Sequence, residues 1–167
     1  MKPAFFVSGV PCTGKTWLGS WLSQERGFHH VDAEKNNGAD LDAVGIRHEW
    51  NLTISTGRAE DLTKKIAALS KPVVLNWGFP MCYLYFVKAL QVADIETWWI
   101  QTDPPLARKA FIERGGIDVK YFDKQMSDIV RHSLLLEFLF GDHVVEGLKA
   151  DGTQRHPKDL WNEMTGE

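Results

Sequence analysis

Near its N-terminus the chain reads Gly9-Val10-Pro11-Cys12-Thr13-Gly14-Lys15-Thr16, and this stretch fits the pattern G-x-x-x-x-G-K-[ST]. The two glycines let the backbone wrap around an anion, so that successive N–H groups point inward at phosphate oxygens. Lys15 supplies a positive charge for the β and γ phosphates of a nucleotide, and the Thr16 hydroxyl can ligate Mg²⁺. The stretch therefore predicts a phosphate-binding loop, or P-loop.

The segments on either side of this loop have the structure that a P-loop requires. Lys2 to Ser8 is apolar on both faces, which is typical of a strand inside a parallel sheet. Thr16 to Arg26 predicts a helix whose N-terminal dipole points at the bound phosphate. The loop pattern alone should arise by chance in on the order of 1% of chains of this length. With a strand before it and a helix after it, nucleotide binding is the better explanation.

Composition indicates an ordinary water-soluble domain. The length of 167 residues predicts a single domain over residues 1–167 with a sizeable core. The net charge of −3 argues against a nucleic-acid surface, because no basic excess is available to neutralise phosphates. No apolar run approaches the length of a membrane span, and the chain opens on a predicted strand rather than a signal peptide. We therefore expect a cytoplasmic protein without a membrane or nucleic-acid partner.

The two cysteines, Cys12 and Cys82, form neither a disulfide framework nor a metal-ligand spacing. Cys12 lies in the P-loop near Lys15 and a helix N-terminus, an environment that can lower the pKa of its thiol. The alternative is a small side chain that fills a tight turn, and we favour this second interpretation.

Strands and helices alternate along the rest of the chain. Further strands are predicted at Phe28–Asp32, Pro72–Trp77, Ile95–Thr102 and His143–Glu146. Helices are predicted at Leu41–Trp50, Ala59–Leu69, Met81–Ala93, Asp103–Arg114, Lys120–Phe140 and Pro157–Met164, with Lys35–Asp40 as a polar loop. This alternation predicts an α/β fold, a three-layer P-loop NTPase fold with a five-stranded parallel sheet.

The carboxyl ends of the predicted strands meet at one edge of the sheet, where open α/β folds bind their ligands. That edge holds the P-loop, Asp32, Trp77-Gly78 and Asp103. A GTPase-like switch protein should carry a D-x-x-G turn at the end of its third strand and an N-K-x-D guanine reader, and this sequence has no D-x-x-G at the end of Pro72–Trp77 and no N-K-x-D. The third strand ends in Asn76-Trp77-Gly78 in place of the magnesium-holding aspartate of such proteins.

On these features the sequence resembles the small P-loop kinases, the group of shikimate kinase, gluconate kinase and the nucleoside monophosphate kinases. The resemblance covers most of the chain and rests on the P-loop, the D-x-E after the second strand, a third strand ending in W-G, and an arginine-bearing segment after the fourth strand. It also includes the turn Gly147-Leu148-Lys149-Ala150-Asp151-Gly152, where these kinases usually seat adenine.

The resemblance implies a role for each matching residue. Residues expected to contact the nucleotide are Gly9, Cys12, Thr13, Gly14, Lys15, Thr16, Trp17 and Arg108, with Thr16 also on the metal. Catalytic roles fall to Lys15, Asp32 and Arg114, since a carboxylate beside the γ-phosphate can accept the hydroxyl proton and an arginine can stabilise the transferring phosphoryl group. The acceptor is expected to contact Asp32, Glu34, Arg58, Trp77 and Gly78.

Departures from the family pattern concern the acceptor. Shikimate kinase has a triple-glycine turn where this chain has Asn76-Trp77-Gly78-Phe79-Pro80, so aromatic rings replace bare backbone and shikimate is disfavoured. Arg47 and Arg58 lie in the segment that covers the acceptor, and either can bind an anionic group. Lys120, Lys124 and Arg131 share one helical face, which is either a positive stripe facing the phosphates or, more commonly, a solvated face.

The sequence thus predicts an ATP- and Mg²⁺-dependent kinase that phosphorylates a hydroxyl of a small molecule. Its expected partners are ATP and that acceptor. Two alternatives remain open: a nucleoside or nucleotide kinase of the same fold, and a nucleotide-binding protein without phosphotransferase activity.

Overall fold

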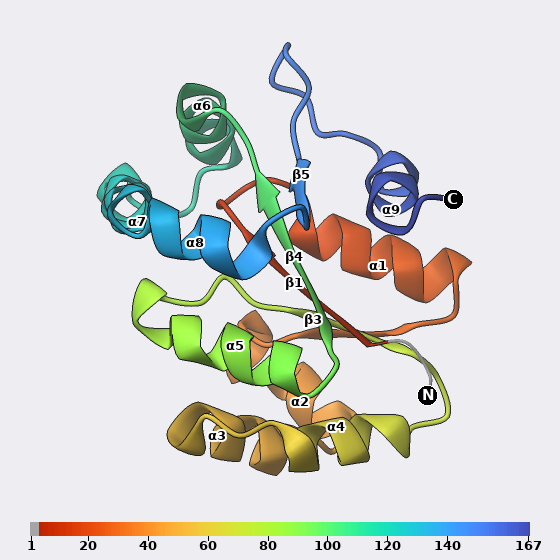
Figure 1. Ribbon diagram of the computed structural model, residues 1–167. Coiled ribbons are helices and arrows are strands. Elements are labelled where there is room, and N and C mark those ends of the chain that lie inside the picture. The colour runs from red at the N-terminus through yellow and green to blue at the C-terminus, as the bar shows by residue number, and fades with distance from the viewer. Residues whose placement is uncertain (1–3) are drawn as a thin grey trace.

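The computed structural model describes residues 4–167, so Lys2 of the first predicted strand lies outside the described residues. Five parallel strands form the central sheet in the order β2-β3-β1-β4-β5 (Figure 1). Their bounds are β1 (Ala4–Gly9), β2 (His29–Asp32), β3 (Val73–Asn76), β4 (Glu96–Gln101) and β5 (Val144–Glu146). The five-stranded parallel sheet and the α/β fold predicted from the sequence are confirmed.

Helices cover both faces of this sheet (Figure 1). One face packs against α1 (Lys15–Glu25) and α9 (Pro157–Thr165). The other elements of the described chain are η1 (Lys35–Asn37), α2 (Ala39–Ala43), α3 (Arg47–Thr56), α4 (Glu60–Ala67), η2 (Met81–Tyr83), α5 (Leu84–Val92), α6 (Pro104–Arg114), α7 (Val119–Arg131) and α8 (Ser133–Phe140). Within residues 4–167, no helix has both the length and the apolar character needed to cross a membrane.

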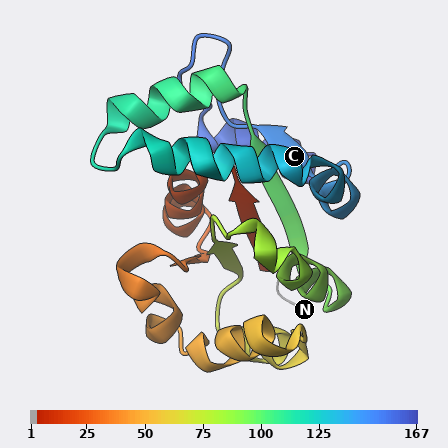
Figure 2. The same ribbon diagram turned by 90° about the vertical axis from the view of Figure 1, so that its left-hand side faces the viewer.

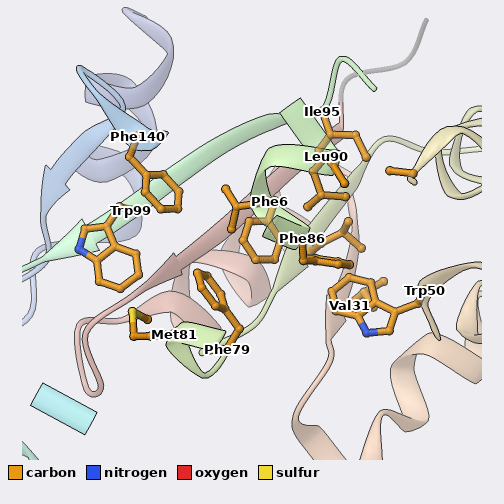
Figure 3. Packing of buried hydrophobic residues seen from close by; sticks show 14 of the residues in the cluster. Phe6, Val31, Trp50, Phe79, Met81, Phe86, Leu90, Ile95, Trp99 and Phe140 are labelled. Atoms are coloured by element: carbon orange, nitrogen blue, oxygen red, sulfur yellow. The ribbon is translucent and has the colours of Figure 1, made fainter. Parts of the chain in front are cut away.

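The two-residue period of β1 divides the core into two clusters. Phe6 points to one side of the sheet, while Phe5 and Val7 point to the other, as alternating side chains of a strand must. On the larger side, the ring of Phe6 lies 5.9 Å from that of Phe86, which in turn lies 4.7 Å from Trp50 (Figure 3). Burial of each such side chain stabilises the fold by about 1.5–3 kcal/mol. The aromatic cluster therefore holds α3 and α5 against the central strand.

The predicted helix over Leu41–Trp50 is wrong, because the chain forms two helices there. α2 ends at Ala43, Gly45 adopts a left-handed conformation with φ of 71°, and α3 begins at Arg47. The predicted polar loop over Lys35–Asp40 likewise contains η1 and the first turn of α2. Ile46, between the two helices, is fully buried, so the break lets the chain insert this side chain into the core.

The single helix predicted over Lys120–Phe140 is also wrong, since it divides into α7 and α8 at His132. That residue has φ of −104° and ψ of 14°, and its ring Nδ1 lies 2.8 Å from the carbonyl oxygen of Asp128. The break changes which side chains face the core. Leu136 and Phe140 are buried, whereas Val130 is 64% exposed.

Candidate active site

The P-loop links β1 to α1, and contact with β4 fixes its shape. A Cβ atom on Gly9 would lie 2.0 Å from the carbonyl oxygen of Ile100, so only glycine fits beside the neighbouring strand. The Thr13 hydroxyl donates to the Val10 carbonyl oxygen at 2.8 Å and braces the loop from inside. Gly14 is left-handed, with φ of 94°, immediately before the first residue of α1. The exposed N–H groups of the α1 N-terminus thus open onto the loop.

Lys15 lies at the centre of the loop. Its ammonium donates to the carbonyl oxygens of Gly9 at 3.0 Å and Val10 at 2.8 Å. Burial lowers the pKa of this ammonium to about 8, against the opposing effects of Glu34, Cys12 and Asp32. A bound polyphosphate supplies negative charge at the same place, so it favours the protonated lysine.

ATP affinity is expected to fall about tenfold between pH 7 and pH 9, because the charged fraction of a group with a pKa near 8 falls by that factor. Binding at pH 8 should then take up about half a proton per site, as phosphate restores the charge of Lys15. Calorimetry in two buffers with different ionisation enthalpies measures this uptake. Lys15→Arg is the control, since its guanidinium stays charged. Flat affinity over this range without proton uptake would contradict the prediction.

Cys12 has a positive φ of 65° and is partly buried in the loop. Burial raises the pKa of its thiol, while Arg114 and Lys15 lower it to a lesser extent. The low-pKa thiol considered from the sequence is therefore wrong. Cys12 fills a turn, as the other interpretation held.

Asp32 is the last residue of β2, and its side chain contacts Thr16. Its Oδ2 accepts the Thr16 hydroxyl at 3.1 Å, and its Oδ1 accepts the backbone N–H groups of Glu34 at 3.0 Å and Lys35 at 3.2 Å. Both carboxylate oxygens thus accept hydrogen bonds. Those from Glu34 and Lys35 hold the turn that follows β2. In register beside it, Asn76 on β3 donates to the Lys15 carbonyl oxygen at 2.6 Å and ties α1 to the sheet.

Thr16 and Asp32 form a donor set that suits Mg²⁺. This ion prefers oxygen ligands and takes only one or two of them from the protein, with phosphates and water completing its shell. A hydroxyl and a carboxylate oxygen 3.1 Å apart beside the P-loop match that requirement. The described residues contain no group of three or more histidine, cysteine or carboxylate side chains that resembles a dedicated metal cage.

A cavity of about 460 Å³ opens above the P-loop. Among the residues predicted from sequence, its wall includes Cys12, Gly14, Lys15, Thr16, Trp17, Glu34, Gly78 and Arg114. The chain segments that meet here are far apart in the sequence: the P-loop, the turns after β2 and β3, and the end of α6. The fold therefore brings most of the predicted site to one place.

Arg114 enters this cavity from the last turn of α6. Its guanidinium lies 5.0 Å from the centre of the Phe111 ring, and its charge lowers the pKa values of Lys15 and Cys12. Gly115 and Gly116 follow with φ of 67° and 86°, and a Cβ atom on either would meet no atom within 4 Å among the described residues beyond its chain neighbours. Arg114 thus precedes two left-handed glycines with open space on their Cβ side.

Other predicted residues do not line the cavity. Gly9 and Thr13 lie in the P-loop but not in the cavity wall, and Asp32 is hydrogen-bonded to Thr16 outside that wall. Arg108 bonds to Asp123 at 2.8 and 3.2 Å on the exposed side of α6 and α7. Arg58 is exposed beyond the end of α3, and the Trp77 ring packs 5.4 Å from Trp50 and 5.3 Å from Phe86.

Three of the other positive side chains considered from the sequence are paired with acidic residues, and the fourth, Lys124, is exposed. Arg47 bonds to Asp42 and to the Asn37 carbonyl oxygen at 2.7 Å. Lys120 and Arg131 pair with Asp118 and Asp128 at 3.0 and 3.6 Å, and both are more than 70% exposed. These contacts favour a solvated face for α7 over a positive stripe aimed at phosphate.

Several residues of the cavity wall were not predicted from the sequence. Tyr121, Phe122 and Gln125 from α7 line the side opposite the P-loop. Gln154 reaches the loop from the turn after β5 and donates to the Cys12 carbonyl oxygen at 3.2 Å. No sequence motif marked these residues as part of the site.

Searches of protein-family models and of curated proteins found no match to this chain. Solved structures do match it. A gluconokinase from Sinorhizobium meliloti shares 16% identity over 98% of this chain and 90% of its own, with a TM-score of 0.56. A shikimate kinase from Bacteroides thetaiotaomicron shares 14% identity, with coverage of 98% and 95% and a TM-score of 0.58.

A shikimate kinase from Acinetobacter baumannii, solved in complex with shikimate, shares 12% identity over 98% of this chain and 91% of its own, with a TM-score of 0.58. At such low identities the likeness establishes the fold and not the reaction. The fold is that of the small P-loop kinases, as the sequence resemblance implied.

Proposed function

We propose that this chain is an ATP- and Mg²⁺-dependent kinase that transfers the γ-phosphate to a hydroxyl of a small molecule. The main support is one cavity of about 460 Å³ in which the P-loop lysine, a carboxylate and an arginine meet. Phosphoryl transfer needs this combination, because its catalysis consists almost entirely of positioning the reactants and stabilising charge.

In this proposal Lys15 and the N–H groups of the P-loop hold the β and γ phosphates. Thr16 and Asp32 hold Mg²⁺, which neutralises charge on the phosphate oxygens when it is bound. Arg114 stabilises the charge that spreads over the transferring phosphoryl group, as the resemblance to the family implied.

Glu34 is the residue that we assign to the acceptor hydroxyl. Its side chain is exposed on the cavity wall, and its charge is the largest of those that oppose the lowering of the Lys15 pKa by burial. A Cβ atom on Gly78 would lie 3.3 Å from both Glu34 carboxylate oxygens, so glycine leaves this carboxylate room. A carboxylate in this position can orient a hydroxyl and accept its proton during transfer.

A panel of acceptors tests the function. Purified protein is incubated with Mg²⁺ and either ATP or GTP, together with polyols, sugar acids, nucleosides or nucleoside monophosphates, and ADP or GDP release is measured. Turnover with a polyol or sugar acid supports the proposal. Preference for a nucleoside or nucleotide supports the first alternative, and tight ATP binding without turnover on any acceptor supports a non-catalytic role.

The segment from Arg108 to Lys120 is expected to move as a lid. It contains Arg114 and the left-handed Gly115 and Gly116, and its closure would exclude water from the γ-phosphate. Amide hydrogen exchange over this segment should slow at least about tenfold when nucleotide and acceptor are both bound. Exchange in α4 serves as the internal control. Unchanged exchange over residues 108–120 in the ternary complex would identify a rigid helix end.

A further inference from the structure

A second cavity, of about 260 Å³, adjoins the cavity above the P-loop. Gly78, Tyr121 and Gln125 line both of them. The second cavity lies between α7 and the chain that follows β3, and in Figure 2 α7 (teal) crosses above that chain (yellow-green). We propose that this second cavity binds the α-ammonium and α-carboxylate groups of a hydroxyl-bearing amino acid, which is the phosphoryl acceptor. This inference rests on the proposed function and names the class of its acceptor.

The two walls of the second cavity differ in character. Four side chains of α7 lie at i, i+3, i+4 and i+7 within this one helix and so share one side of it: Tyr121, Lys124, Gln125 and Asp128. The opposite wall is the apolar segment of residues 78–81. The cavity therefore has an apolar side and a side that carries one positive and one negative charge.

The two charges on α7 are available to a ligand. Lys124 and Asp128 are one helical turn apart, a spacing at which opposite charges can pair, yet no ion pair joins them. Lys124 is exposed and, within residues 4–167, has no acidic partner. Asp128 pairs with Arg131 at 3.6 Å, which is longer than the roughly 2.7–2.9 Å of a charge-assisted hydrogen bond. Each charge therefore has room for a closer partner.

Charge complementarity favours a zwitterion at this wall. An anion alone would be repelled by Asp128, and a cation alone would be repelled by Lys124. The two side chains start about 5–6 Å apart, so both can reach groups that are attached to the same carbon atom, as in an α-amino acid. The cavity is smaller than the roughly 300–1,000 Å³ of sites for drug-sized ligands, so it suits a small metabolite.

Gly78 connects the second cavity to the carboxylate that we assign to the acceptor hydroxyl. A Cβ atom on Gly78 would lie 3.3 Å from both Glu34 carboxylate oxygens, so the side chain of a bound amino acid passes this glycine to reach Glu34. Its hydroxyl oxygen forms a bond to the γ-phosphorus of ATP, and the bond from that phosphorus to the bridging oxygen breaks. ADP leaves, and the hydroxyl proton passes to Glu34. The product is an O-phospho amino acid.

Matched acceptors test which charges are recognised. L-Serine and L-homoserine carry both charged groups, 3-hydroxypropionate and 4-hydroxybutyrate lack the ammonium, and 2-aminoethanol and 3-aminopropanol lack the carboxylate. Calorimetry in the presence of Mg²⁺ and a non-hydrolysable ATP analogue measures their dissociation constants. At least one of the two amino acids should bind about tenfold or more tightly than both of its single-charge analogues, since each lost ion pair removes a charge-assisted hydrogen bond.

Two variants assign the charges to residues. Lys124→Gln should weaken binding of that amino acid about tenfold and leave binding of the amino alcohol unchanged, while Asp128→Asn should spare the hydroxy acid instead. Lys88→Gln is the matched control, because Lys88 is an exposed lysine on α5 that lines neither cavity. Unchanged amino-acid binding in Lys124→Gln and Asp128→Asn would overturn the proposal, as would equal weakening by all three variants.

ADP release from ATP separates this proposal from the proposed function. Turnover of a polyol or sugar acid, without binding of either amino acid, overturns the acceptor class and leaves the kinase function standing. Amino-acid binding that depends on Lys124 and Asp128, without ADP release on any acceptor, supports the binding site and contradicts the kinase function. If the protein binds the ATP analogue but neither L-serine nor L-homoserine, the acceptor class is wrong.

Discussion

Lys15→Ala is expected to weaken ATP binding by about two orders of magnitude and to leave adenosine binding nearly unchanged. The ammonium is the positive group at the centre of the P-loop, where it already bonds to two loop carbonyl oxygens. A charge-assisted hydrogen bond of this kind contributes about 1.5–3 kcal/mol, and about 2.7 kcal/mol corresponds to a hundredfold change in affinity. Calorimetric titration with ATP and with adenosine measures both effects.

Lys64→Ala is the control for this experiment. Lys64 is 77% exposed on α4 and pairs with its neighbour Asp61, so its loss removes one positive charge outside the P-loop. ATP affinity in this variant should stay within about twofold of wild type. Equal losses for ATP and adenosine in Lys15→Ala would mean that the lysine supports the loop and not the phosphates.

Glu34→Gln is expected to lower phosphoryl transfer by about two orders of magnitude with ATP affinity almost unchanged. This is the usual scale for a positioned acid–base group, and glutamine keeps the size of the side chain while removing its basicity. Single-turnover rates with a working acceptor, set beside ATP dissociation constants, separate the two effects. Wild-type transfer in Glu34→Gln would remove this carboxylate from the mechanism.

Asp32→Asn should behave differently, although it lies only two residues away. Its carboxylate accepts the Thr16 hydroxyl and two backbone N–H groups, and an amide cannot accept all three. We expect the Mg²⁺-dependent part of ATP affinity to fall and the free energy of unfolding to drop by about 1–3 kcal/mol. If Asp32→Asn instead binds ATP as tightly as the wild type and only its rate of phosphoryl transfer falls, then Asp32 is the residue that acts on the acceptor hydroxyl.

These two carboxylates show how much of the site could be predicted from the sequence. The D-x-E pattern predicted that Asp32 and Glu34 share a site, and it favoured Asp32 for the acceptor hydroxyl. In the structure Glu34 lies on the cavity wall, while both oxygens of Asp32 are engaged beneath it. The pattern identified the position of the site in the chain but did not separate the roles, because each role depends on contacts with Thr16 and Gly78.

The arginines of α6 show the same limit. The resemblance assigned Arg108 to the nucleotide and Arg114 to the phosphoryl group, and of the two only Arg114 lines the cavity among the described residues. It did not reveal that Arg108 bonds to Asp123, since that partner comes from α7, 15 residues further along the chain. The helix breaks at Gly45 and His132 were missed for a related reason: burial of Ile46 and of Leu136 decides where the chain must turn.

The sequence by itself determined the P-loop, the alternation of strands and helices, and the edge of the sheet where the site lies. These features depend on residues adjacent in the chain, whose backbone preferences and hydrophobic periods act locally. Only the tertiary structure decided which carboxylate and which arginine face the cavity, and which side of α8 is left exposed. Those outcomes depend on strand register and helix packing, which join residues as distant as Cys12 and Gln154. Side-chain direction is set by such long-range contacts, and no local pattern records them.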